Sequence, residues 1–451
     1  MYTAQARPCY PDLLMRQLIP RAERYFEFDA LGTSWRTECL AGVTTFMTMA
    51  YIVFVNPSIL HDAGMPIAGV TAATCLAAAV GSLLMGGFAR YPIALAPGMG
   101  LNAYFAYSVV KGMGVDWHTA LGAVFISGVA FLLLTALGIR QMIVNAIPSE
   151  LYSAVAAGVG LFIAFIGLRN AGIVVSDPAT TVALGNLRAP GTLLALFGLM
   201  LTGALLCARV RAAILIGVLA TWALAAVSGT IQWHAQPYSV AAITSTALQL
   251  NVRGAIGRGL FEIVFVFLFV DLFDNVGTLV AVGKKAGLFD ETHKIPRVNR
   301  ILFSDAIATI TGAMAGTSTV VSYIESSAGV AAGGRSGVTA IVVGLLFVVA
   351  LFVAPLAGAL PESATAPALI LVGSMMMTTA AEIEWTEPGI AIPAFLTMLA
   401  IPLTFSIANG LAFGFISYTL LKVLRGRFRE VNWMVYVLTA LFVARFWYLG
   451  R

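Results

Sequence analysis

The sequence predicts an all-α polytopic membrane protein. Of its 451 residues, 59% are hydrophobic and only 10% are charged, and the mean hydropathy of +0.91 lies far above that of a soluble protein. The apolar residues fall in runs of about 17 to 25, which is the length that an α-helix needs to cross hydrocarbon. A membrane β-barrel would instead show short segments of alternating polarity, so we expect a bundle of transmembrane helices.

We expect fourteen spans in two sets of seven. The first set covers residues 37–57, 67–88, 92–110, 118–138, 149–170, 191–208 and 209–229. The second set covers residues 259–283, 300–314, 318–334, 337–358, 366–381, 389–408 and 409–424. In an alternative count, the last two runs form one helix broken around Pro402 and Gly410, and residues 432–447 are the fourteenth span. We favour the first count, in which residues 432–447 lie along the membrane interface.

This count divides the chain into five segments. They are an N-terminal arm at 1–36, a first repeat at 37–229, a polar connection at 230–258, a second repeat at 259–424 and a cytoplasmic or interfacial C-terminal segment at 425–451. The arm is rich in Arg and has no cleavable apolar core, so it is not a signal peptide. Lys and Arg also gather after residues 283 and 421, and such clusters mark the cytoplasmic side. We expect both termini in the cytoplasm and the protein in the plasma membrane, the inner membrane of a bacterium.

The composition argues against several other roles. The net charge of +5 is typical of inner-leaflet anchoring by Lys and Arg, so anionic lipid is the expected partner and nucleic acid is not. Four cysteines are scattered without the spacing of metal ligands, and four histidines fall at span ends or in loops. No nucleophile with a base is found at membrane depth. We therefore expect no enzyme activity, no cofactor and no metal site.

Two sets with an odd number of spans predict internal symmetry, because the second set must then enter the membrane inverted. Transporters with inverted repeats commonly place their binding site at mid-membrane, between discontinuous helices. The third and tenth spans contain such interrupted segments, "ALAPGMGLNAYF" at 94–105 and "GTSTVVSYIESSAGVAAGG" at 316–334. We predict a short strand followed by a half-helix in each, with the amino ends of the half-helices offering free N–H groups to a ligand.

A polar stripe in the eighth span marks the expected centre of the site. On a helix, Asp271, Asp274, Asn275 and Thr278 are three or four residues apart and share one face. An Asp at the bilayer centre costs about 2.5 to 3.5 kcal/mol on insertion scales, which makes it a functional candidate. Two neighbouring carboxylates repel each other when both are ionised, so we expect this pair to share a proton and to couple proton movement to transport.

The remaining acidic residues have competing interpretations. Glu325, at the start of the tenth half-helix, is a second candidate for ligand binding, and a plain helix-dipole partner is the alternative. For Asp271 and Asp274 the alternative is hydrogen bonding within a broken helix. Glu262 is expected at the membrane interface, and a solvated loop is expected to hold Glu382, Glu384 and Glu387.

Several stretches resemble one transporter family. In order, "AGVTTFMTMAYIVFVNPSIL", "YPIALAPGMGLNAYFAY", "NAIPSEL", "FVDLFDNVGTLV" and "SYIESSAGVAAGGRSG" are similar to motifs of the adenine/guanine/hypoxanthine permeases, the AzgA-like branch of the nucleobase/ascorbate transporter superfamily. The resemblance runs from about residue 27 to the C-terminal region. It implies a core domain of spans 1 to 4 and 8 to 11, a gate domain of spans 5 to 7 and 12 to 14, proton-coupled purine uptake, and a homodimer held through the gate domains.

The resemblance also assigns roles by position. It implies that Asp274 and Glu325 bind the base and that Asp271 is an additional proton-coupling aspartate. The segments implied to face the base supply the further candidates Asn275, Gly100, Leu101, Asn102, Ser326 and Ser327. The chain departs from the family pattern at Asn275 and Val321, near which many members carry a hydroxyl, so the preferred purine stays open.

The chemistry of a purine suits these residues. Its ring N–H groups can donate to carboxylates, and its ring nitrogens and exocyclic oxygen can accept from backbone amides. We expect Phe105 or Phe273 to cover the ring face. Two alternatives remain at this stage. One is a uracil or xanthine permease, and the other is an anion exchanger or channel of the same fold, in which the acids would repel the anion.

Overall fold

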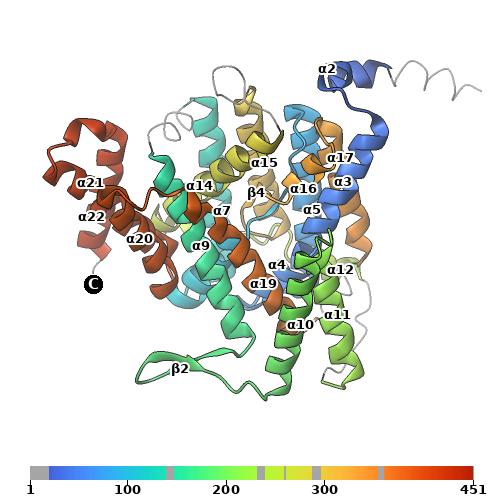
Figure 1. Cartoon of the computed structure of the whole chain (residues 1–451), viewed down its shortest axis with the longest axis horizontal. Coiled ribbons are helices and arrows are strands. Elements are labelled where there is room, and N and C mark those ends of the chain that lie inside the picture. Colours follow the sequence, from blue (N-terminus) through green and yellow to red (C-terminus); the bar gives the residue numbers. More distant parts are fainter. Residues whose placement is uncertain are drawn as a thin grey trace, which may run out of the picture.

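The structure of the chain is a computed structural model that describes residues 20–138, 147–230, 239–257, 261–286, 296–353 and 360–449. His234, His293, most of the N-terminal arm and the first two residues of "NAIPSEL" lie outside the described residues. The described chain is mostly helical, as the composition predicted, and its helices form one bundle (Figure 1).

Apolar helices of membrane-spanning length make this a multi-pass membrane protein. Within the described residues, seven helical stretches are long and apolar enough to cross a membrane: Trp35–His61, Ile67–Ala89, Trp117–Ala136, Ser149–Asn170, Pro190–Cys207, Glu362–Glu382 and Ile407–Leu424. Four shorter apolar helices accompany them: Ala213–Val227, Gly337–Ala350, Pro388–Leu403 and Trp433–Trp447.

The elements of the first half follow the predicted spans closely. They are α2 (Phe28–Leu31), α3 (Trp35–Met49), α4 (Ile52–His61), α5 (Ile67–Leu84), η1 (Met85–Ala89), β1 (Leu95–Pro97), α6 (Met99–Ala103), η2 (Tyr104–Gly112), α7 (Trp117–Ala136), α9 (Ser149–Asn170), β2 (Val174–Asp177), β3 (Thr181–Leu184), α10 (Pro190–Cys207) and α11 (Ala213–Val227). The β2–β3 hairpin projects from one end of the bundle (Figure 1).

Two short helices, α12 (Val240–Ile243) and α13 (Val252–Gly257), lead into the second half. Its elements are α14 (Phe261–Ala286), α15 (Val298–Ala315), β4 (Val320–Ser322), α16 (Ser326–Ala331), α17 (Gly337–Ala350), η3 (Leu351–Val353), α19 (Glu362–Met376), η4 (Met377–Glu382), α20 (Pro388–Leu403), α21 (Ile407–Leu424), η5 (Phe428–Glu430) and α22 (Trp433–Leu449). Helices α20 and α21 are separate, and α22 packs against α21.

A two-stranded sheet joins the two halves of the chain. Strands β1 and β4 pair antiparallel, with Ala96 opposite Val321, and each strand runs directly into a short helix, β1 into α6 and β4 into α16. Pro97 interrupts the helix because it has no N–H group to donate, and the backbone N–H of Gly98 bonds instead to the Thr319 carbonyl at 2.9 Å. The predicted strand and short helix are therefore present in both segments.

The helices pack in two groups. The strand group surrounds the sheet and consists of α3, α4, α5, η1, β1, α6, η2, α7, α14, α15, β4, α16 and α17, in which α5 contacts both α15 and α17. The flanking group consists of α9, α10, α11, α19, η4, α20 and α21, in which α19 lies against α9 and α20 lies against α21 (Figure 1). The boundary between the two groups is where the cavity described below lies.

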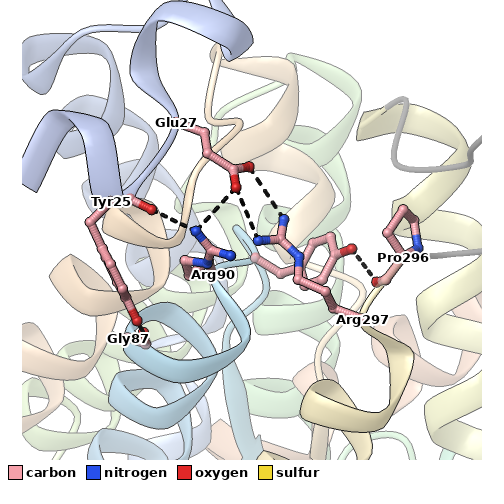
Figure 2. A network of polar contacts seen from close by, with 7 residues as sticks. Tyr25, Glu27, Gly87, Arg90, Pro296 and Arg297 are labelled. Carbon is pink, nitrogen blue, oxygen red and sulfur yellow. Dashed lines mark hydrogen bonds and ion pairs between the residues drawn. The ribbon is translucent and has the colours of Figure 1, made fainter.

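A polar network fastens the chain before α2 to the strand group (Figure 2). The Glu27 carboxylate pairs with Arg90, which follows η1, at 3.1 Å and with Arg297, which precedes α15, at 3.4 Å. Arg90 also donates to the Tyr25 carbonyl at 2.8 Å, and the Tyr25 hydroxyl donates to the Gly87 carbonyl at 2.6 Å. Residues from three separate elements thus meet at one end of the bundle.

A buried carboxylate joins α3 to the start of α17. The side chain of Glu38 is fully buried. It accepts hydrogen bonds from the backbone N–H groups of Arg335 at 2.9 Å and Ser336 at 3.1 Å, and from the Thr339 hydroxyl at 2.6 Å. A carboxylate at a helix amino end is favoured by the helix dipole, so Glu38 satisfies donors that would otherwise be buried without partners.

Replacing Glu38 by Ala is expected to destabilise the protein. Each buried donor left without a partner costs about 1 to 3 kcal/mol, and Ala leaves the Arg335 and Ser336 N–H groups in that state. The melting temperature of the purified protein in detergent should fall by several degrees. The matched control is Glu384→Ala, because Glu384 is exposed; equal melting temperatures for the two variants would contradict the assigned role of Glu38.

Candidate functional site

A cavity of about 170 Å³ lies between the strand group and the flanking group. The strand group supplies Tyr51, Met99, Gly100, Asp274, Thr278, Val321, Ser322, Tyr323, Ile324 and Glu325. The flanking group supplies Ser149, Tyr152, Ser153 and Ala156 from α9, Val372 and Met376 from α19, and Thr379 and Glu382 from η4. Since drug-sized ligands occupy pockets of about 300 to 1,000 Å³, this smaller cavity suits a small molecule.

Two carboxylates from the two predicted segments meet at this cavity. Asp274 lies on α14 and Glu325 is the residue before α16, and both side chains line the space. The Tyr51 hydroxyl donates to the Glu325 carboxylate at 2.7 Å. The Tyr323 hydroxyl donates to the Pro97 carbonyl at 2.6 Å, which ties the segment before Glu325 to β1. The Glu325 carboxylate is thus held at a defined position in the wall.

The polar stripe on α14 divides into two parts. Asp274 and Thr278 line the cavity, whereas Asp271 and Asn275 do not. The Asn275 amide donates to Asp271 Oδ1 at 3.1 Å, and its oxygen accepts from the Ser322 N–H at 2.9 Å. Asn275 therefore bridges α14 and β4 and does not line this cavity, although the sequence predicted it at the site. The four residues share one broad face, but packing on β4 buries half of it.

The first interrupted segment presents only its start to the cavity. Met99 and Gly100 line it, while Leu101 and Asn102 are fully buried elsewhere. Asn102 accepts a hydrogen bond from the Ser318 hydroxyl. A Cβ on Gly100 would lie 2.3 Å from Val159 Cγ1, so only glycine lets α6 approach α9 here. Of the three residues predicted in this segment, the structure brings Gly100 alone to the cavity.

The second interrupted segment also differs from the prediction. The backbone N–H groups of Ser326 and Ser327 bond to the carbonyls of Tyr323 at 3.1 Å and Ile324 at 2.9 Å. The Ser326 hydroxyl accepts from the Ala94 N–H at 3.0 Å. Neither serine lines the cavity. The N–H groups that the sequence suggested for a ligand are therefore bonded to carbonyls of the turn that precedes α16.

The flanking group supplies cavity residues that the sequence analysis missed. Phe105 and Phe273 do not line the cavity, contrary to expectation, but Tyr152 does, and its ring packs on Phe273 with 4.6 Å between centroids. Glu382 was expected in a solvated loop; it ends η4, lines the cavity and accepts from the Ser153 hydroxyl at 3.1 Å. Tyr51 and Tyr323 also line the cavity, and both lie inside sequence motifs shared with the family, which could have identified them as candidates.

A cavity with central carboxylates, held between two groups of apolar helices, defines this protein as a membrane transporter. A sequence profile described as "Permease family" matches residues 36–414. The chain is 43% identical to the adenine permease AdeP of Escherichia coli over 423 residues, covering 94% of this chain and 95% of that protein. It is 46% identical to the guanine/hypoxanthine permease PbuG of Bacillus subtilis over 441 residues, covering 94% and 99%. The chain belongs to this permease family, in its purine branch.

Solved structures with the same fold include the transmembrane domain of the cyanobacterial bicarbonate transporter BicA. The superposition has a TM-score of 0.63 at 16% sequence identity, and it covers 85% of this chain and 98% of that chain. Because the sequences are so different, the likeness shows a shared fold and carries no information on the ligand.

Proposed function

We propose that this protein takes up purine nucleobases, namely adenine, guanine or hypoxanthine, by proton symport across the plasma membrane. The observation that carries the proposal is the meeting of Asp274 and Glu325 in one small cavity. The names of the relatives AdeP and PbuG support the same substrate class. A polar ligand that offers N–H donors is what two carboxylates select.

The residues of the cavity match the parts of a purine. Ring N–H groups donate to Asp274 and Glu325, and the Tyr51 hydroxyl keeps the Glu325 carboxylate oriented. Ring nitrogens or an exocyclic oxygen accept from the backbone at Met99 and Gly100, because the first N–H groups of a helix have no partner within it. Tyr152 covers a ring face from the flanking group.

We further propose fourteen spans in two inverted repeats. Contacts between helices support this, because contacts between the halves have counterparts in which the two halves are exchanged. Span 2 packs on span 11 (α5 on α17), and span 9 packs on span 4 (α15 on α7). In the same way span 5 packs on span 13 (α9 on α20), and span 12 packs on span 6 (α19 on α10). In this assignment the strand group is the core domain and the flanking group is the gate domain. The resemblance adds a homodimer through the gate domains, which light scattering of the purified protein tests; a monomeric mass would contradict it.

The transport cycle follows from this division. Ser149 and Glu382 are the exposed residues of the lining, so the cavity opens where α9 begins and η4 ends. Lys422 and Arg425 lie near the end of α21 that reaches this face, and Glu387, close to η4, pairs with Arg425, so we assign this face to the cytoplasm, with the N-terminal arm. Helix α22 runs back along α21, where Arg445 donates to Asn409 at 3.0 Å, so its last residues lie away from this face, contrary to the expectation of two cytoplasmic termini. Protonation of the Asp271 and Asp274 pair outside favours base binding, and the loaded core domain then moves against the gate domain.

Uptake by cells that lack their own purine transporters tests the function. Labelled adenine, guanine and hypoxanthine are each supplied, and saturable uptake of at least one is expected. A protonophore should lower this uptake by about tenfold, because the driving force is the proton gradient. If excess unlabelled uracil or xanthine blocks the uptake and the unlabelled forms of these three purines do not, the substrate is a different nucleobase. No uptake of any labelled purine, with normal membrane expression, would overturn the proposal.

A further inference from the structure

The ionisable side chains that line the cavity are all acidic among the described residues. Asp274 and Glu325 belong to the strand group, and Glu382 belongs to the flanking group. The described lining contains no Lys, Arg or His. A ligand between the two walls therefore meets carboxylates from both.

Glu382 is held in place where the cavity opens. The Ser153 hydroxyl donates to its carboxylate at 3.1 Å. Ser153 is itself fastened, since its carbonyl accepts from the Thr379 hydroxyl at 3.1 Å. All three residues line the cavity, so the flanking group presents an oriented carboxylate with two hydroxyl neighbours on the way in and out.

The charge of Glu382 has no cationic partner among the described residues. Nearby carboxylates are different: Glu387 receives a hydrogen bond from Arg425, which holds its pKa below the usual range, and Glu430 receives one from Lys422 at 2.7 Å. Glu382 is exposed, and its carboxylate lies at the opening of the cavity. Its negative charge therefore acts on whatever occupies the opening of the cavity.

We propose that Glu382 is a specificity-determining residue that excludes anionic ligands from the cytoplasmic opening of the cavity and admits neutral bases. The inference rests on the proposed function, because it names which charge state of a purine the site accepts. Like charges about 6 Å apart near solvent weaken binding by roughly threefold to tenfold. A neutral ring pays no such penalty and can donate an N–H group to the carboxylate.

The test compares a neutral and an anionic purine on purified protein in detergent. Unsubstituted purine and purine-6-carboxylate compete for bound labelled hypoxanthine or adenine, and the ratio of their dissociation constants is measured. Glu382→Gln keeps an oxygen that can accept from Ser153. In this variant the ratio of the dissociation constant of purine-6-carboxylate to that of purine should fall by roughly threefold to tenfold. Glu382→Ala should lower it equally, and Glu382→Asp, which keeps the charge, should preserve most of it.

Glu384→Gln is the matched control. Glu384 lies two residues after Glu382, but its side chain does not line the cavity. Its ratio should equal that of the parent protein. Purine binding with an unchanged ratio in both neutral Glu382 variants would overturn this inference alone. Failure of the parent protein to bind any labelled purine would overturn the proposed function and this inference together.

Discussion

Replacement of Asp274 by Asn is expected to lower purine uptake by about 100-fold or more. A hydrogen bond to a charged group is worth about 1.5 to 3 kcal/mol, and the Asn amide can also present a donor to the N–H group of the base. Asn cannot release a proton, so the residual uptake should no longer respond to a protonophore. The measurement is the initial rate of labelled purine uptake with and without the protonophore.

Asp116→Asn is the control for this experiment. Asp116 is the exposed residue that caps the start of α7, far in sequence from α14, and its replacement should leave uptake near the parental rate. Surface expression of both variants is compared by immunoblot. Proton-dependent uptake at the parental rate in Asp274→Asn would contradict the role assigned to this carboxylate.

A disulfide between residues 58 and 365 is expected to stop transport. Ser58 lies on α4 of the strand group and Thr365 on α19 of the flanking group, and their hydroxyl oxygens are 3.3 Å apart. Cysteine sulfurs would take the places of these oxygens, and a disulfide forms when the two Cβ atoms come within about 3.5 to 4.5 Å of each other. In the proposed transport cycle the two groups move against each other, so oxidation should lower uptake by about twentyfold or more, and a reductant should restore it.

The disulfide experiment uses a background in which Cys9, Cys39, Cys75 and Cys207 are replaced by Ser. The single variants Ser58→Cys and Thr365→Cys should be insensitive to oxidation. The bridge lies near the start of α19, at the opposite end from Glu382, so the oxidised protein should still bind labelled purine in detergent. Parental uptake with complete cross-linking would contradict movement between the two groups.

The sequence predicts the class of protein and the two carboxylates that meet at the cavity. Long apolar runs predict membrane helices, because a helix of that length crosses the hydrocarbon core and bonds its backbone N–H and C=O groups to one another. Pro97 and the β-branched run before Ser322 predicted the two interruptions that became β1 and β4. Asp274 and Glu325 were identifiable because a carboxylate within an apolar run needs a specific reason to be there.

Which neighbours of these residues face the cavity depends on how distant parts of the chain pack together. Sequence spacing places Asn275 and Thr278 on one helix face, but the backbone of Ser322 donates to Asn275, and Thr278 is left to line the cavity. Tyr152 and Glu382 reach the cavity because the flanking group, which comes from separate stretches of the chain, packs across it. The physical reason is that helical periodicity specifies a face, whereas the partner of that face is chosen by packing between distant segments.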